Sequence, residues 1–208
     1  MRIKVSPTRM ELLRLRKRIE LARRGHKLLQ DKLEGLIKEF MPLIEDYVRL
    51  RAELDRRTPE VLSLFARVAA ETGEENLRAA LTQTGFRASV AISEKRLANI
   101  PVPVLEAEFE RSRPFYSLTG TPRMLDRASE ELAELLPVML QCVEREQAVR
   151  RLAAEIERTR RRVNALEYIM IPRLQEARKF IQSKLDEDER AARVRNMKVK
   201  ELLEKSAE

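Results

Sequence analysis

Few side chains in this sequence have the type and spacing that catalysis or metal binding requires. The chain contains a single histidine, His26, and a single cysteine, Cys142. One cysteine forms no intrachain disulfide and supplies no cysteine-based zinc site. Neither residue is joined by a second histidine or a glycine-rich loop. We therefore predict a protein that is not an enzyme, with no catalytic, metal-binding or cofactor-binding residue.

His26 lies within a long apolar seam, and its position has two interpretations. As a functional group it would be a pH-sensitive device that fixes the register of paired helices, because histidine changes charge near neutral pH. As a structural group it would be a polar residue near the end of a coil, tolerated there because it is partly solvated. The sequence favours the structural interpretation.

Arginine clusters are the remaining candidates for recognition. The net charge of +8 and the pI near 9.9 permit binding to nucleic acid, anionic membranes or acidic proteins. No aromatic residues interleave the clusters, which argues against a nucleic-acid groove. A solvated coiled-coil face is the simplest interpretation, and an electrostatic protein contact is the main alternative. The candidate protein-contact residues are Arg9, Arg16, Arg23, Arg24, Arg161, Arg162 and Arg193.

A long helical seam must position these side chains. Because an α-helix drifts by about 20° per heptad from a 3.5-residue repeat, a sustained seam predicts left-handed supercoiling around a partner helix. Thr8 and Glu11 form a capping box at its start. Thr58–Pro59 predicts a kink or restart before the helix ends at Gly73. The seam residues are Leu12, Leu15, Ile19, Ala22, Leu29, Leu33, Leu36, Phe40, Leu43, Tyr47, Leu50 and Leu54.

Residues 73–121 form a middle insert that cannot continue the helix, because glycines and prolines gather there. Residues 86–92 and 100–104 have the pattern of two short strands, which predicts a β-hairpin near residues 85–105. Pro101 and Pro103 alternate within the second strand and restrict it to an edge position.

A second helical segment begins with Thr121–Pro122 and fills residues 122–208. Its seam is less regular: Glu146 and Thr159 weaken it, and the step from Met170 to Leu174 predicts a stutter. We therefore predict an all-α fold, a long antiparallel two-helix left-handed coiled coil with the small hairpin insert and both termini at one end. Residues 1–72 and 122–208 are the two shaft helices. The second seam is Leu125, Ala128, Leu132, Leu136, Met139, Val143, Val149, Leu152, Ile156, Val163, Leu166, Met170, Leu174, Ala177, Ile181 and Leu185.

Composition agrees with an extended helical protein. With 37% charged residues, 4% aromatic residues and no tryptophan, the chain lacks the bulky side chains of a large globular core. The lone cysteine fits a reducing compartment. No stretch approaches the roughly 18 apolar residues of a membrane span, so we expect any membrane association to run through partners.

Three segments resemble one known family. Residues 161–174, RRVNALEYIMIPRL, closely resemble the C-terminal signature of the D subunit of the V-type and A-type ATP synthases. Pro7–Thr8–Arg9 and residues 23–32, RRGHKLLQDK, look like the opening motif of that family. Residues 100–103, IPVP, are similar to its middle segment. The resemblance covers essentially the whole chain.

The resemblance implies a central rotor shaft, or central stalk, that carries torque. Its paired termini would enter a hexamer of alternating catalytic A and B subunits, and its lower body would bind the F subunit and the socket subunit, of C or d type, above the membrane ring. ATP would be hydrolysed by the surrounding subunits, in the cytoplasm and peripheral to the membrane. From the residues alone, a static basic coiled-coil scaffold that binds nucleic acid or an anionic surface remains open.

Overall fold

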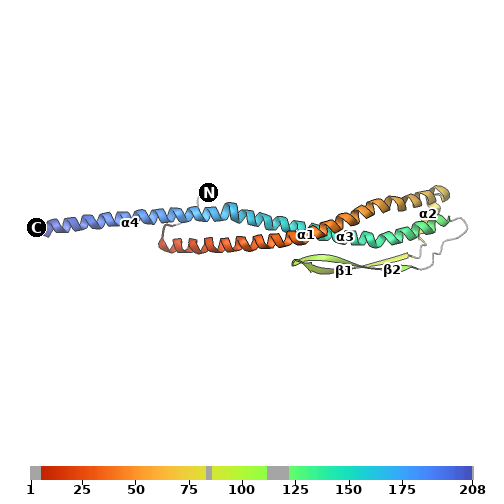
Figure 1. The fold of residues 1–208 in the computed structure, drawn as a ribbon, viewed down its shortest axis with the longest axis horizontal. Coiled ribbons are helices and arrows are strands. Elements are labelled where there is room, and N and C mark those ends of the chain that lie inside the picture. The colour runs from red at the N-terminus through yellow and green to blue at the C-terminus, as the bar shows by residue number, and fades with distance from the viewer. Residues whose placement is uncertain (1–5, 83–85, 112–121, 208) are drawn as a thin grey trace. The chain divides into compact units, whose positions relative to one another are not determined.

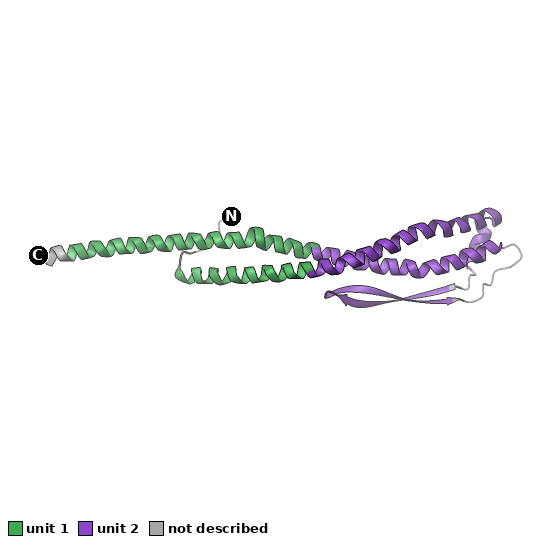
Figure 2. Ribbon diagram, viewed as in Figure 1, with its two compact units in different colours: residues 1–34, 157–208 green, residues 35–156 purple. Residues whose placement is uncertain are grey.

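Helices dominate the described part of the chain, which the computed structural model gives as residues 6–82, 86–111 and 122–207 (Figure 1). The order is α1 (Arg9–Thr72), α2 (Glu74–Thr82), β1 (Phe86–Leu97), β2 (Ile100–Arg111), α3 (Arg123–Asn164), the π-helix η1 (Ala165–Met170) and α4 (Ile171–Ala207). Long helices with a β-hairpin insert confirm the predicted fold class. The chain divides into two units (Figure 2): residues 35–156, called the body unit, and residues 1–34 with 157–208, called the terminal unit.

Helix α1 begins with half of the predicted capping box. The backbone N–H of Glu11 donates to the Thr8 hydroxyl oxygen at 3.2 Å, which satisfies one of the free N–H groups of the first turn. The Thr8 N–H donates to the carbonyl of Ser6, and the Glu11 carboxylate lies 3.5 Å from Arg14. The reciprocal bond of a full capping box is thus replaced by two local contacts.

The end of α1 lies where the sequence predicts it, but the helix does not restart on the way. Pro42 and Pro59 both lie inside one helix that runs to Thr72. Gly73 then adopts a φ of 87°, a left-handed conformation that glycine reaches without steric cost, and its N–H donates to the Ala69 carbonyl. The short helix α2 follows at once, an element that the sequence analysis missed.

The body unit is an antiparallel pair of the second part of α1 and most of α3. Arg57 of α1 joins the helices, with its guanidinium 3.9 Å from Glu131 and 3.7 Å from Glu134 of α3. Val68, Ala80 and Leu125 form an apolar cluster in which α2 covers the end of the pair. This cluster explains why α2 forms here, because the apolar face of α2 packs on the core of the helix pair.

The hairpin of β1 and β2 is longer than predicted. Each strand has 12 residues, and the register pairs Phe86 with Arg111 and Leu97 with Ile100. Ala98 and Asn99 form the turn with φ of 48° and 65°, the positive values of a tight type I′ turn. Val102 is buried against Ala148 and Leu152 of α3, with Phe40 and Leu43 of α1 beside them. The hairpin therefore contributes to the core of the body unit.

In the terminal unit, the first part of α1 runs antiparallel to the end of α3, η1 and α4. Arg9 and Glu189 form an ion pair at 2.6 Å, while His26 lies opposite Glu167. The buried apolar side chains among the described residues of this unit are Leu15, Ile19, Val163 and Ile181. The start of α1 lies beside α4, so the amino-terminal end of the first helix meets the carboxyl-terminal helix (Figure 1).

The predicted seam is confirmed for α1 and wrong in part for the return arm. Every predicted seam residue of α1 is buried or half-buried, and so are Leu174, Ala177, Ile181 and Leu185 of α4. In α3 the predicted Leu125, Ala128, Leu152 and Val163 are buried, and the predicted Leu136 and Val149 are half-buried beside the buried Leu135 and Ala148. Cys142 is buried in place of the predicted Val143. Met139, Val143 and Met170 are exposed instead. Thr159, expected to weaken the seam, is buried within it.

Candidate protein-interaction surface

All seven predicted contact arginines lie in the terminal unit and are exposed. Arg9 pairs with Glu189 across the two helices, whereas Arg24 pairs with Glu20 and Arg161 with Glu157 within one helix. Exposed ion pairs of this kind contribute about 0–1 kcal/mol, so a partner displaces them easily. The other four, Arg16, Arg23, Arg162 and Arg193, make no ion pair with a described residue.

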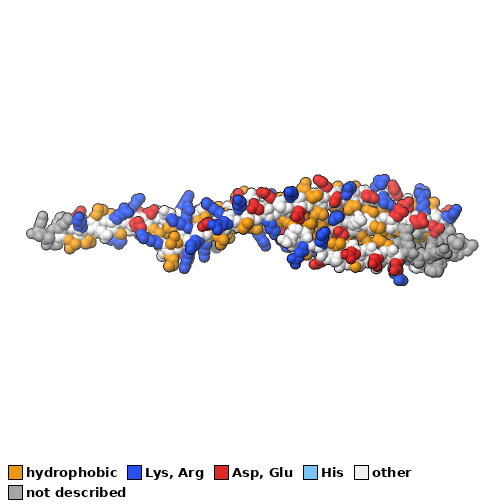
Figure 3. Space-filling view, turned by 60° about the horizontal axis from the view of Figure 1, so that its bottom comes forward, with side chains coloured by type: hydrophobic (Ala, Val, Ile, Leu, Met, Phe, Trp, Pro, Cys, Tyr) orange, Lys and Arg blue, Asp and Glu red, His pale blue; other side chains and the backbone are white. Residues whose placement is uncertain are grey.

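Large apolar side chains also lie exposed on the terminal unit, and the sequence analysis missed them. Leu21 is 71% exposed and Tyr168 is 70% exposed. In the space-filling view, hydrophobic side chains of this unit lie among basic ones (Figure 3). Their signal in the sequence is their position off the seam, as with Leu13 beside Leu12. The exposed set is Met10, Leu13, Leu21, Leu28, Tyr168, Ile169, Met170, Phe180, Val194, Met197, Val199, Leu202 and Leu203.

The carboxyl-terminal end of α4 continues beyond the start of α1 (Figure 1). Glu189 pairs with Arg9, the first residue of α1, and α4 runs on to Ala207. Most of the stability of a helix in a protein comes from packing an apolar face. Val194, Met197 and Leu202 are exposed on this stretch. This stretch therefore resembles a helix whose apolar side chains are covered only when a partner protein binds.

The segment with the family-like signature forms the π-helix η1. The N–H of Ile171 donates to the carbonyl of Leu166, five residues earlier. Glu167 of η1 places its Oε2 3.4 Å from the Nε2 of His26, an atom that is buried and makes no hydrogen bond with a described residue. The His26 side chain as a whole is 21% exposed. The π-helix lies opposite the lone histidine and ends at Met170, where the predicted stutter begins.

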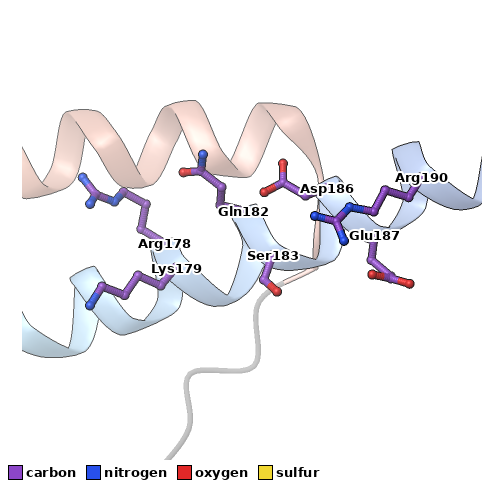
Figure 4. Close-up of a pocket in the computed structure, with 7 residues that line it drawn as sticks. All are labelled: Arg178, Lys179, Gln182, Ser183, Asp186, Glu187 and Arg190. Carbon is purple, nitrogen blue, oxygen red and sulfur yellow. The ribbon is translucent and has the colours of Figure 1, made fainter.

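The described surface includes two hollows of different character. One of about 330 Å³ on α4 is lined only by polar side chains, which Figure 4 shows projecting from successive turns. A larger one of about 780 Å³ in the body unit lies between the hairpin and the helix pair, lined by residues such as Leu43, Lys95 and Val104. Among the described residues no three His, Cys, Asp or Glu side chains gather as metal ligands.

Cys142 faces the core of the body unit. Its side chain is buried, and burial raises the pKa of the thiol, an effect that the nearby Arg51 guanidinium partly offsets. A protonated, inaccessible thiol is a poor nucleophile.

No described helix is long and apolar enough to cross a membrane.

Comparison with known proteins relates both units to one family. The family model described as the D subunit of ATP synthase matches residues 11–201. The A-type ATP synthase D subunit of Thermococcus gammatolerans is 42% identical over 205 residues, which cover 97% of this chain and 96% of that protein. The V-type ATP synthase D subunit of Acetivibrio thermocellus is 42% identical, with 97% and 92% covered. The A-type D subunit of Methanopyrus kandleri is 40% identical, with 97% and 88% covered.

Proposed function

The chain belongs to the family of ATP synthase D subunits, and on this premise we propose that it is the central rotor shaft of a V-type or A-type rotary ATPase. In this role it transmits torque between the catalytic A and B hexamer and the ion-translocating ring in the membrane. The chain itself carries no catalytic residue. It works in the cytoplasm, held at the membrane through the complex.

The observation that carries this proposal is the exposure of large apolar side chains on the terminal unit. Large apolar side chains such as Leu21, Leu28 and Phe180 stand in water there, among arginines that make no ion pair with a described residue. A soluble protein that exposes apolar residues over so much of one region usually has a partner to cover them. A collar of subunits that surrounds the helix pair covers exposed residues on all of its sides at once.

The partners divide between the two units. The terminal arms, roughly residues 5–24 and 186–203, lie inside the hexamer of A and B subunits. The body unit, residues 35–156, binds the F subunit and the socket subunit above the ring. Its helix pair is joined by Arg57 to Glu131 and Glu134, a link that resists sliding of one helix along the other.

Purification of the tagged chain from its host tests this assignment. We expect the A, B and F subunits and the socket subunit to be recovered with it. Replacing the exposed Leu13 and Leu21 by Asp should abolish recovery of A and B, because a carboxylate would be buried against the collar.

The matched control is Leu62→Asp in the body unit, where a similarly exposed leucine is changed. It should leave recovery of A and B intact. Recovery of nucleic acid without any ATPase subunit would contradict the proposal and leave the static scaffold as the better account.

A further inference from the structure

The two edges of the β-hairpin are not equally open to a further strand. Strand β2 lies next to α3, where the N–H of Leu105 donates to the Glu144 carboxylate at 3.3 Å. The Arg151 guanidinium of α3 donates to the carbonyl of Pro101 at 2.5 Å. Strand β1 pairs with the opposite edge of β2, and every side chain over residues 87–96 is exposed (Figure 1). Strand β1 is therefore the open edge of the hairpin.

The pairing of the two strands shows which backbone groups of β1 point away from β2. In an antiparallel pair, hydrogen-bonded and non-hydrogen-bonded residue pairs alternate. Leu97 and Ile100 close the two-residue turn as a hydrogen-bonded pair, so the next pair, which contains Pro101, is not hydrogen-bonded. Pro103 falls in the same class two residues on, as a residue without an N–H must. The residues of β1 whose N–H and carbonyl groups point outward are therefore Ala88, Val90, Ile92, Glu94 and Arg96.

Strand β2 has the features that block an edge, and the middle of β1 lacks them. Proteins commonly protect sheet edges by proline, by charge or by a covering element. Pro101 and Pro103 remove two donors from the outer edge of β2, and α3 covers part of the rest. Residues 88–93, ASVAIS, contain no proline and no charge, and no hydrogen bond joins their outward backbone groups to another described residue. These groups are complementary to the backbone of a further extended strand.

One face of β1 extends an apolar surface of the hairpin to this open edge. Directly opposed residues share a face of the sheet, so Ile92 lies beside Leu105, and Val90 lies beside Ala107. Leu105 and Ala107 are half-buried, whereas Val90 is 46% exposed and Ile92 is 73% exposed. A strand that pairs with β1 and carries apolar residues on this face would cover both exposed side chains.

A second copy of β1 supplies such a strand in one register. Outward-pointing residues must meet outward-pointing residues, because only they present N–H and carbonyl groups to the other strand. When Val90 lies opposite Val90 of the second copy, Ile92 lies opposite Ala88, so apolar residues meet on the apolar face. The uncharged stretch 88–93 then fills the centre of the contact.

The two neighbouring registers that satisfy the same rule fit less well. One of them places Arg87 opposite Lys95, and like charges directly opposite each other destabilise a strand pair. The other places the Glu94 carboxylate opposite Val90 on the apolar face. The register centred on Val90 avoids both conflicts.

The charges on the other face also suit this register. Arg87 of the second copy comes opposite Ser93, whose hydroxyl lies 3.4 Å from the Glu106 carboxylate on β2. Arg87 and Glu106 are both exposed, and only the short Ser93 side chain stands between them. Within its own hairpin Arg87 lies opposite Glu110, but no ion pair joins the two in the structure. Each copy therefore offers a cation to a carboxylate of the other, which favours this pairing over others.

We propose that two copies of the free chain pair through their β1 edges, antiparallel and related by a two-fold axis at Val90. The two hairpins then form one four-stranded sheet, with an α3 helix beside each outer edge. The contact is isologous, since the same strand is used on both sides. A contact between two strand edges is small, so the association is weak and depends on concentration. The contact is separate from the proposed rotor function, because it uses neither the terminal unit nor an ATPase partner.

Sedimentation velocity of the full-length chain over a range of concentrations tests the pairing. We expect the average mass to rise from that of a monomer toward that of a dimer. Val90→Pro should raise the dissociation constant at least tenfold, because it removes an outward N–H and leaves the bonds within the hairpin intact. The matched control is Val90→Thr, which keeps the N–H and should change the dissociation constant less than threefold. Both melting temperatures should stay close to the parent.

Disulfide formation tests the register without a proline. In a Cys142→Ala background, Val90→Cys places two cysteines at the two-fold axis, where opposed Cα atoms of a hydrogen-bonded pair lie about 5.5 Å apart. A disulfide spans this distance, so mild oxidation should give a covalent dimer. Ile92→Cys is the matched control, because its two cysteines are offset by four residues, roughly 14 Å along the strands. It should crosslink at least tenfold more slowly.

Three outcomes would overturn the proposal. The first is a chain that stays monomeric at every concentration, or one that associates equally well with Val90→Pro. The second is crosslinking of Ile92→Cys as fast as Val90→Cys, because the strands would then not meet in this register. The third is a monomeric parent in which Val90→Pro abolishes recovery of another protein with the tagged chain, which would show that the edge binds that protein and not a second copy.

Discussion

The body unit and the terminal unit bury their apolar side chains to different extents. In the body unit, α2 and the hairpin cover the helix pair, and buried residues such as Val68, Leu125 and Leu152 form two clusters. In the terminal unit the helices have no such cover among the described residues, and side chains as large as Tyr168 and Phe180 stay exposed. Both units use the same antiparallel pairing of helices.

This difference indicates that the two units are stabilised in different ways. The body unit completes its own core with inserted elements, whereas the terminal unit leaves a surface that another protein can cover. Because hydrophobic stabilisation follows the area removed from water, substitutions in the body unit should act mainly on folding. Substitutions on the surface of the terminal unit should act mainly on assembly.

The largest contrast is expected between a buried and an exposed leucine of the same helix. Leu36→Asp places a carboxylate in the seam, where an unpaired charge costs several kcal/mol, and should lower the thermal midpoint severely. Leu21→Asp, at a site 71% exposed, should shift it little. Leu33→Asp, at a half-buried site, should fall between them. Circular dichroism melts decide this, and a midpoint for Leu36→Asp within error of the parent would show that the seam is wrongly assigned.

Removing the hairpin should have the next largest effect on stability. It should act on the body unit and leave the helix pairing of the terminal unit intact. Replacing residues 86–111 by a short linker exposes Ala148 and Leu152, and burial of side chains such as Val102 contributes roughly 1.5–3 kcal/mol each. We expect a lower melting temperature with the helices still paired. A disulfide between cysteines placed at Arg9 and Glu189 should still form in the monomer. Loss of helical content on deletion would mean that the hairpin is not an accessory.

Ion pairs offer a smaller contrast between the units. Arg57 is 22% exposed and lies near Glu53, Glu131 and Glu134, so Arg57→Gln should reduce the free energy of unfolding by about 1 kcal/mol. Arg9→Gln should cost less, since Arg9 and Glu189 are both well exposed. Urea titrations at low and high salt measure both. Equal losses for the two variants would argue against the better-ordered contact in the body unit.

The smallest effect on stability is expected from the thiol of Cys142. Burial raises the pKa of the thiol in the folded chain, so on raising the pH the thiol ionises first in the unfolded chain. The contribution of this group to the free energy of unfolding is therefore present below the pKa of the unfolded chain and is lost as the pH rises through the pKa of the folded chain. Alkylation at pH 8.5 should therefore be at least tenfold slower at Cys142 than at a cysteine placed at Arg16 in a Cys142→Ala background. Mass spectrometry follows both rates, and equal rates would show that the thiol is accessible.

The sequence predicted α1 better than the return arm for a physical reason. The seam of α1 consists mostly of large aliphatic or aromatic residues spaced by three and four, so the buried face is clear from the sequence. In α3 the buried positions include Cys142 and Ala148, small side chains that a search for apolar bulk passes over. Where two apolar residues are adjacent, as with Leu135 and Leu136, periodicity alone does not say which one faces the partner helix.

The sequence indicated the charged residues of the proposed interaction surface but not its exposed apolar residues. The seven arginines do lie exposed on one unit. Which leucines are exposed, and that Tyr168, Ile169 and Met170 of η1 are exposed, depends on which face the partner helix leaves uncovered, and that follows from the three-dimensional pairing. The four-residue step from Met170 to Leu174 predicted a local disturbance, but the form that the helix takes nearby, a π-helix over Ala165–Met170, is not visible in the residue spacing.

The rotor account is tested most directly by locking the terminal unit to its collar. In a Cys142→Ala background, cysteines are placed one at a time at Arg16 and Arg193, both exposed, and crosslinked to cysteines in the surrounding A or B subunits of the assembled complex. A locked shaft should abolish sustained ATP turnover, and reduction of the disulfide should restore it. A cysteine at the same position without a partner cysteine is the control. Unimpaired turnover in the fully crosslinked complex would contradict the rotor account.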